Sequence, residues 1–268
     1  MYIYCGIFVC YEESNYFCII CIICSDFFSV CRNNSSNNSN KEIYNDYSNN
    51  TYVRVGIYVY DYPMIYLSNN NLSGFDYDIM NEIAKLENLK LEYMQTQFSE
   101  LIPSLQNNII DIAIAGISIT EERKKLVSFS DKYYSSSQSI IILKDNNDIK
   151  VFDDLLGKSV GVIKDTISDT IISASNNINV VRFDIAGSAL LALKLGNTDA
   201  VMIDRVTCNN YIKYDNDIKI VEDIIFPELD YGIAVRKDDN VLLKKINNAL
   251  HTIMSNGVYE KLINKHLN

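Results

Sequence analysis

The sequence predicts an α/β fold with mostly parallel sheets, and the spacing of its apolar residues is the main reason. From residue 52 onward that spacing switches repeatedly between two, typical of a strand, and about 3.6, typical of a helix. Such alternation favours parallel sheets flanked by helices, and about nine expected strands suit two five-stranded sheets. No repeat with a period of about 20–50 residues is present, which excludes a solenoid.

The first half of this region predicts three strands and two helices. Apolar residues place strands at 53–59, 89–93 and 109–117. The third is a nearly unbroken apolar run with one charge, as expected of a buried parallel strand. Helices are expected from about Asp76 and from Ser99, whose hydroxyl can cap the free amides of a helix start.

The second half repeats the same alternation. Strands are expected at 160–163, 180–183, 200–203, 218–221 and 231–235. Helices are expected at 152–156, 170–174 and 189–195, and from about residue 240 to the C-terminus. Gly157 and Gly196 follow two of these helices and can end them.

The charge and the cysteine distribution exclude several function classes. Lys and Arg number 24 against 34 Asp and Glu in 268 residues, giving a net charge of −10, so no nucleic-acid partner is expected. Six of the seven cysteines precede residue 32 and only Cys208 follows, so the main body contains no internal disulfide. Isoleucines separate Cys18, Cys21 and Cys24, and no His lies among them, so neither a metal nor a cofactor is expected.

The N-terminal region predicts an export leader followed by a tether. Residues 16–24 are uninterrupted apolar residues, too few for a membrane span of about 20 and suited to a signal peptide. Residues 1–30 are therefore interpreted as a leader, and Cys31 as a lipidated first residue of the mature chain. Glu12 and Glu13 stand where a leader normally carries positive charge, which a true start downstream of Met1 would explain. An ordinary hydrophobic N-terminal strand is the alternative. Asn and Ser fill 12 of the 20 positions from 32 to 51, which predicts a disordered tether over 31–51.

The densest local pattern lies at residues 111–123. A buried strand is expected to end at Gly116, and Thr120 is a suitable N-cap for the following helix. Arg123 would then lie one turn into a helix at the carboxyl end of a strand, where ligands bind in open α/β sheets. Its planar guanidinium suits a bidentate carboxylate contact. Pairing with Glu121, Glu122 or solvent is the alternative.

Together with this pattern, several further stretches resemble bacterial extracellular solute-binding proteins of family 3, the polar amino acid receptors of ABC importers. The resemblance covers about 52–267. The stretches that carry it are 74–78 (GFDYD), 109–134, 155–162 (LLGKSVGV), 199–204 (DAVMID), 231–237 (YGIAVRK) and 256–261 (NGVYEK).

The resemblance implies a type II periplasmic-binding-protein-like fold, in which two lobes close on a ligand like a hinged trap. One lobe would comprise 52–135 plus 230–268, and the other 136–229. The two hinge crossings would lie near 134–137 and 229–231.

The resemblance also implies roles for individual residues. Arg123 matches the arginine that binds the ligand α-carboxylate, and Ser118 the hydroxyl residue that assists it. Gly116 matches the residue whose carbonyl accepts from the α-ammonium group. Asp204 matches the carboxylate of the other lobe that pairs with the same ammonium, although it can also be a helix N-cap.

Two loops depart from the family pattern. In the turn 164–168, Thr166 keeps a central carboxylate-binding position, while Asp165 and Ile167 replace smaller residues. Thr166 and Ile167 are the two residues of this turn expected to contact the ligand. In the first strand–helix loop, Tyr58 stands where relatives often carry an acid, and Asp61 where they stack an aromatic ring. An acid there suits a polar or cationic ligand side chain, whereas a solvated loop with one buried tyrosine is the alternative.

The function implied is that of the substrate-binding component of an amino acid ABC importer, which binds a polar L-amino acid between the lobes. It would be a monomer in the periplasm or outside the cytoplasmic membrane, anchored by lipid, with an ABC permease as partner and no enzymatic activity. An enzyme resembling cyclohexadienyl dehydratase is one alternative, with Glu222 and Glu228 as candidate acids. A ligand-sensing module is the other. His251 and His266 are interpreted as surface or packing residues.

Overall fold

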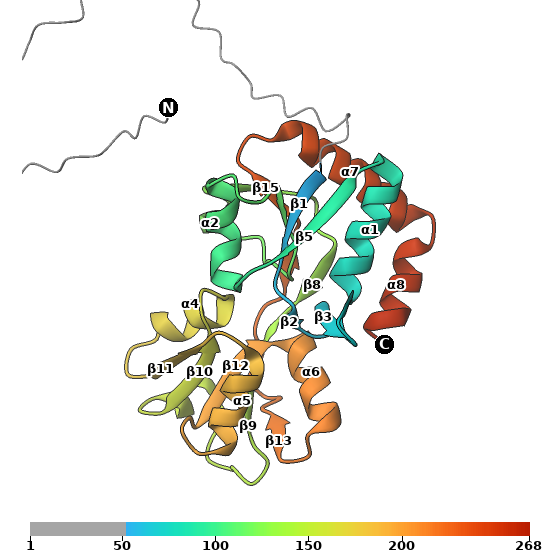
Figure 1. The fold of residues 1–268 in the computed structure, drawn as a ribbon. Helices are drawn as coiled ribbons and strands as arrows, with labels where there is room; N and C mark the ends of the chain where they lie inside the picture. Colours follow the sequence, from blue (N-terminus) through green and yellow to red (C-terminus); the bar gives the residue numbers. More distant parts are fainter. Residues whose placement is uncertain (1–51) are drawn as a thin grey trace, which may run out of the picture. The chain divides into compact units, whose positions relative to one another are not determined.

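The computed structural model describes residues 52–268, so the predicted leader, Cys31 and the tether lie outside the described residues. Two five-stranded sheets dominate the described region (Figure 1). Each sheet with its flanking helices forms one lobe. In each sheet four strands run in the same direction and one runs against them, which confirms the prediction of mostly parallel sheets.

The first sheet has the strand order β5-β1-β6-β15-β7 and forms lobe 1. Its strands are β1 (Tyr52–Ile57), β5 (Lys90–Gln95), β6 (Ile112–Ala113), β7 (Val127–Phe129) and β15 (Ala234–Arg236). Its helices are α1 (Phe75–Glu87), α2 (Leu101–Gln106), α3 (Glu121–Lys124), α7 (Asn240–Ser255) and α8 (Val258–His266). A short 3-10 helix, η1 (Phe98–Glu100), precedes α2.

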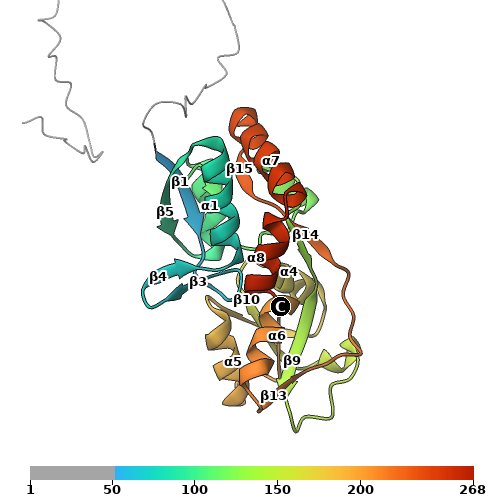
Figure 2. The same ribbon diagram turned by 90° about the vertical axis from the view of Figure 1, so that its right-hand side faces the viewer.

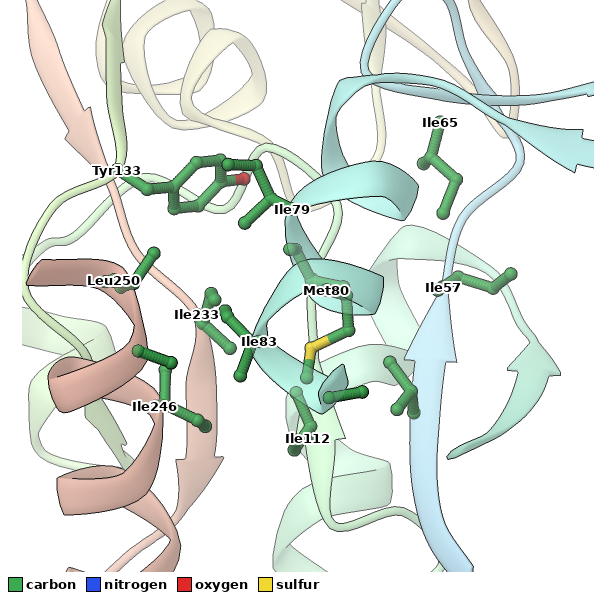
Figure 3. Packing of buried hydrophobic residues seen from close by; sticks show 14 of the residues in the cluster. Ile57, Ile65, Ile79, Met80, Ile83, Ile112, Tyr133, Ile233, Ile246 and Leu250 are labelled. Carbon is green, nitrogen blue, oxygen red and sulfur yellow. The ribbon is translucent and has the colours of Figure 1, made fainter. Parts of the chain in front are cut away.

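The alternation of strand side chains divides the core of lobe 1 between the two faces of the sheet. Val53, Val55 and Ile57 pack against α1 and α7, and Figure 3 shows Ile83 of α1 and Ile246 of α7 meeting on this face. On the other face, Ala113, Val127 and Ala234 share a cluster with residues of α2. The core therefore fixes the strand ends from which the loops of the cleft extend.

The second sheet has the strand order β11-β10-β12-β9-β13 and forms lobe 2. Its strands are β9 (Gln138–Leu143), β10 (Ser159–Ile163), β11 (Asn179–Phe183), β12 (Ala200–Asp204) and β13 (Ile218–Ile220). Its helices are η2 (Phe152–Leu155), α4 (Ile167–Ala174), α5 (Ala186–Lys194) and α6 (Arg205–Tyr214). Ile140 and Met202 face the cluster that contains Ile172 of α4, while Ile141 and Val201 face α5 and α6.

Two short strands connect the lobes. β8 (Tyr134–Ser136) precedes β9 directly, and β14 (Leu229–Tyr231) leads back to β15. They pair antiparallel with each other, with Tyr231 opposite Tyr134. In Figure 2, β14 lies above β9, where the two lobes join.

Several local predictions were wrong. Residues 109–117 do not form one strand, because only Ile112–Ala113 is extended in the sheet and Gly116 turns the chain with a positive φ of 55°. Residues 231–235 divide into β14 and β15 around Gly232, where an added Cβ would lie 2.9 Å from Ile119 side-chain atoms. Ser99 lies inside η1 and caps nothing, since Glu100 occupies the N-cap position of α2.

A small sheet near the cleft was not predicted. It contains β2 (Tyr60–Asp61), β3 (Ile65–Ser68) and β4 (Asn71–Ser73). Asn69 and Asn70 form its tight turn with positive φ angles, which asparagine tolerates better than most residues. Within residues 52–268, no helix is long and apolar enough to cross a membrane.

Candidate functional site

A cavity lies between the two lobes, and all eight residues predicted to bind the ligand line it. Loops at the carboxyl ends of β1 and β6 contribute from lobe 1, and the starts of α4 and α6 contribute from lobe 2. The lining residues are Tyr58, Tyr60, Asp61, Phe98, Ala115, Gly116, Ser118, Arg123, Gln138, Ile163, Thr166, Ile167, Ser168, Ala186, Ile203, Asp204, Thr207 and Tyr231.

Arg123 is the cation of this cavity, and backbone groups hold it in place. The Thr120 hydroxyl accepts from the Arg123 amide at 3.2 Å, which confirms Thr120 as the N-cap of α3. The Arg123 guanidinium donates to the carbonyls of Ser118 and Asp165, both at 3.0 Å, and lies 5.5 Å from the Phe98 ring centre. Burial lowers the Arg123 pKa to about 10, so the group stays charged at neutral pH.

Arg123 does not pair with Glu121 or Glu122, the two carboxylates of its predicted alternative. Glu121 instead pairs with Lys124 at 2.8 Å. Among residues 52–268, no carboxylate oxygen lies within ion-pair distance of the Arg123 guanidinium. Its charge is therefore directed to the cavity and to two neutral carbonyls.

Gly116 and Ser118 lie on the chain segment that leads to α3. The Gly116 amide donates to a carboxylate oxygen of Asp76 at 2.8 Å. An added Cβ at Gly116 would lie 3.2 Å from both Asp61 Oδ2 and the Tyr231 ring, so a larger residue would crowd the cavity. Ser118 is buried and forms an isolated bridge with Tyr231, which ties this segment to the hinge.

Asp204 brings a carboxylate to the cavity from the opposite lobe. It is the N-cap of α6 and accepts from the Val206 amide at 3.0 Å. Side chains from the hinge region also donate to it: Ser136 at 2.6 Å, Gln138 at 3.3 Å, and the Tyr231 hydroxyl. Burial nevertheless raises the pKa of Asp204.

Asp61 adds a second carboxylate, and it accepts from the Thr207 hydroxyl across the cleft at 2.7 Å. Burial is the main cause that raises the Asp61 pKa to about 7, and the nearby charge of Asp204 adds to the shift. The neighbouring Tyr60 and Tyr62 are 45% and 38% exposed. Tyr58 is buried, and its hydroxyl donates to the carbonyl of Asp184 in lobe 2 at 2.6 Å.

The turn 164–168 forms the start of α4. Thr166 is the helix N-cap, and its own hydroxyl donates to the Ile163 carbonyl at 2.7 Å. Asp165 has a positive φ of 60°, is exposed, and does not line the cavity. Its carbonyl, by contrast, accepts from Arg123, so this turn contacts the predicted carboxylate-binding residue.

Sequence reasoning missed Phe98, Gln138, Ser168, Thr207 and Tyr231. Thr207 is one helical turn beyond Asp204, so a search for polar residues on the first turn of α6 would have found it. Tyr231 and Gln138 lie next to the predicted hinge crossings but reach the cavity only through the tertiary arrangement. The Phe98 ring lies beside Arg123 only because the fold brings the two together, so no local sequence pattern predicts the contact.

The cavity therefore combines one cationic group with two acidic ones. Arg123 suits a carboxylate and Asp204 suits an ammonium group, while Asp61 adds a further negative charge. Within the described residues, no three His, Cys, Asp or Glu side chains come together in a way that could hold a metal ion.

Comparisons with known proteins agree on one family. A model of bacterial extracellular solute-binding proteins, family 3, matches residues 53–268. The probable histidine-binding protein of Neisseria gonorrhoeae is 33% identical over 206 residues, covering 74% of this chain and 76% of that protein. The ABC transporter arginine-binding protein 1 of Escherichia coli is 34% identical over 200 residues, covering 73% and 82% respectively.

A solved structure extends the comparison to the fold. The crystal structure of the ancestral amino acid-binding protein AncCDT-1, a precursor of cyclohexadienyl dehydratase, has a TM-score of 0.75 and is 32% identical. The match covers 81% of this chain and 95% of that one. The structural similarity thus spans both lobes.

Proposed function

The chain belongs to the bacterial extracellular solute-binding proteins, family 3, and we propose that it binds an amino acid between its lobes and delivers it to an ABC permease. The lobes are proposed to divide at the hinge as the resemblance implies, into 52–135 with 230–268 and 136–229. The names of the histidine- and arginine-binding relatives support an amino acid as the ligand class.

The observation that carries this proposal is the presence of opposite charges from opposite lobes in one cavity. Arg123 of lobe 1 would bind the α-carboxylate, with the Ser118 hydroxyl as a further donor and Thr166 as a contact from lobe 2. Asp204 of lobe 2 would bind the α-ammonium. A zwitterion that leaves water needs both charges compensated. Because each lobe supplies one of them, binding stabilises the closed arrangement.

The ligand's side chain is proposed to be cationic. Once a zwitterion has compensated Arg123 and Asp204, Asp61 remains as an acidic group on the cavity wall. A buried carboxylate without a countercharge is costly, so a ligand that brings a second positive charge is favoured. The name of the arginine-binding relative supports this choice.

Location and anchoring complete the proposal. The family acts outside the cytoplasm, and residues 1–30 are proposed as the export leader, with lipid attached to Cys31 and 31–51 as the tether. A single lipid chain binds membranes reversibly, so stable attachment would need the multiple chains of a lipoprotein anchor.

The positions of the candidate acids do not favour an enzyme. Glu222 forms an ion pair with Arg205 at 2.7 Å and does not line the cavity, and neither does Glu228. A general acid must come within hydrogen-bond reach of its substrate. The two named relatives are binding proteins, although AncCDT-1 is an enzyme precursor.

Isothermal titration calorimetry of the purified protein with the twenty amino acids tests the proposal. We expect one-to-one binding of arginine, lysine or histidine and much weaker binding of acidic amino acids. Turnover of prephenate or arogenate without binding of any amino acid would contradict the proposal and support the enzyme.

A further inference from the structure

Thr207 occupies a position from which it acts on the cavity through another residue. It lies in the first turn of α6, three residues after the N-cap Asp204, and only 3% of it is exposed. Its hydroxyl donates to Asp61 Oδ1 at 2.7 Å, although 146 residues separate the two in sequence. A residue of lobe 2 therefore fixes one oxygen of a lobe 1 carboxylate.

The groups that face Asp61 explain why this hydrogen bond matters. Six ionisable groups lie near enough to Asp61 to interact with its charge: Asp204 and Tyr211 of lobe 2, Tyr58 and Asp76 of lobe 1, and Tyr133 and Tyr231 next to the hinge. All are acids or neutral phenols, and the cation of the cavity, Arg123, is directed to Ser118 and Asp165. Ionised Asp61 thus meets repulsion and burial, and Thr207 is the side-chain donor that opposes them.

We propose that Thr207 is a positioning residue for ligand selectivity, which favours the ionised form of Asp61 and orients its carboxylate toward the cavity as the lobes close. This inference rests on the proposed function, because it concerns how the same cleft distinguishes side chains. A hydroxyl has one proton to donate, and giving it to Asp61 favours the charged carboxylate over the neutral acid. A ligand with a cationic side chain then gains the most from closure.

The hydrogen bond also links selectivity to pH. Asp61 has a pKa of about 7, so its charge is present above that pH and is lost below it. Binding of a cationic amino acid should therefore strengthen as pH rises through about 7, while binding of a neutral one should change less. Loss of the Thr207 hydroxyl raises the Asp61 pKa further and moves this transition to higher pH.

The test compares Thr207→Val, which keeps the shape but not the hydroxyl, with Thr207→Ser, which keeps the hydroxyl. Dissociation constants for arginine and for its neutral counterpart glutamine would be measured by calorimetry from pH 6 to pH 9. We expect Thr207→Val to weaken arginine binding at pH 7 at least about tenfold more than glutamine binding. The pH at which arginine binding strengthens should be higher in Thr207→Val, and Thr207→Ser should resemble the natural protein.

A double-mutant cycle with Asp61→Asn completes the test. In the Asp61→Asn background, Thr207→Val should no longer change the arginine-to-glutamine ratio. If Thr207→Val weakens both ligands equally and leaves the pH profile unchanged, Thr207 is only structural and the inference is wrong. It is also wrong if the natural protein prefers glutamine to arginine. If the natural protein binds no amino acid at all, the proposed function itself fails.

Discussion

The hydroxyl of Tyr58, at the end of β1, donates to the backbone carbonyl of Asp184 at 2.6 Å, although 126 residues separate them. Tyr58 belongs to the core of lobe 1, whereas Asp184 follows β11 of lobe 2. The bond therefore crosses the cleft, as do those from Thr207 to Asp61 and from Arg123 to the Asp165 carbonyl. Direct contacts between the lobes thus contribute to closure.

Replacing Tyr58 by Phe should shift the lobes toward an open arrangement. One neutral hydrogen bond is worth about 0.5–1.5 kcal/mol, so affinity for every ligand should fall roughly two- to tenfold. The ratio between ligands should stay constant, unlike the effect expected of Thr207→Val. Calorimetry measures the affinities, and small-angle X-ray scattering measures how far the two lobes open.

Tyr93→Phe is the matched control, because the Tyr93 hydroxyl donates to Asn81 inside lobe 1 at 3.2 Å. Both substitutions remove one phenolic hydroxyl from a tyrosine, but only Tyr58→Phe removes a bond between lobes. Equal effects of the two on affinity would show that the Tyr58–Asp184 contact plays no part in closure.

Arg123→Lys should weaken amino acid binding even though the charge is kept. Lysine lacks the planar fork that lets Arg123 contact two carbonyls and still face the cavity. Arg123→Ala should abolish detectable binding, since removing one partner of a buried charge pair costs about 2–5 kcal/mol. Calorimetry gives the affinities.

Arg182→Lys is the corresponding control, because Arg182 pairs with Asp169 on the surface of lobe 2 and does not line the cavity. It should leave the affinity unchanged. Retained affinity in Arg123→Ala would refute the role assigned to this residue.

The contrast between local and long-range contacts explains how much of the site could be predicted from the sequence. Thr120 and Asp204 are N-caps, and a cap is defined by neighbours within three residues, so the chain itself reveals them. Residues near these caps, such as Arg123, could be located in the same way. The alternation of apolar residues likewise predicted the two five-stranded sheets.

The contacts that crossed the cleft could not be predicted. Thr207 and Tyr58 have partners more than a hundred residues away, and no periodicity encodes such a meeting. The prediction of one strand at 109–117 was wrong for a related reason. Burial alone makes a segment apolar, and Ile114, Ala115 and Ile117 are buried without pairing as a named strand.

Asp204→Asn should reduce amino acid affinity about 30-fold or more while leaving the fold intact. Asparagine caps helices as well as aspartate does, so the start of α6 is kept. What is lost is the negative charge proposed to pair with the ligand ammonium, a loss worth about 2–5 kcal/mol. Thermal unfolding and calorimetry separate the two effects.

Asp239→Asn provides the comparison, since Asp239 is the N-cap of α7 and lies away from the cavity. The Asp239→Asn variant loses a charge next to Arg236 but should bind the amino acid with the affinity of the natural protein. If Asp204→Asn binds as tightly as Asp239→Asn, then the ammonium group is recognised elsewhere.

Asp76 should make the protein less stable as pH rises through the range from about 4 to about 8. It is fully buried and accepts from the Gly116 amide and the Tyr133 hydroxyl, both at 2.8 Å. Burial raises its pKa from 3.8 to about 8 despite these two bonds. Between the two values the unfolded chain has released the proton and the folded chain retains it, so stability falls with rising pH. Asp76→Asn should remove this part of the slope in urea unfolding.

Asp78, two residues further along α1, should change the pH dependence of stability in the opposite direction, and it serves as the control. Lys265 and His266 contact its carboxylate and lower its pKa, so its contribution to stability is present above the unfolded pKa and is lost as pH falls. Asp78→Asn should therefore lower stability at neutral pH, with a difference from the natural protein that shrinks toward acid pH, and so flatten a slope that rises with pH. If the slope of Asp76→Asn between pH 4 and pH 8 falls as steeply as that of the natural protein, Asp76 is ionised in the folded protein. In that case the Gly116 amide and the Tyr133 hydroxyl compensate its buried charge fully.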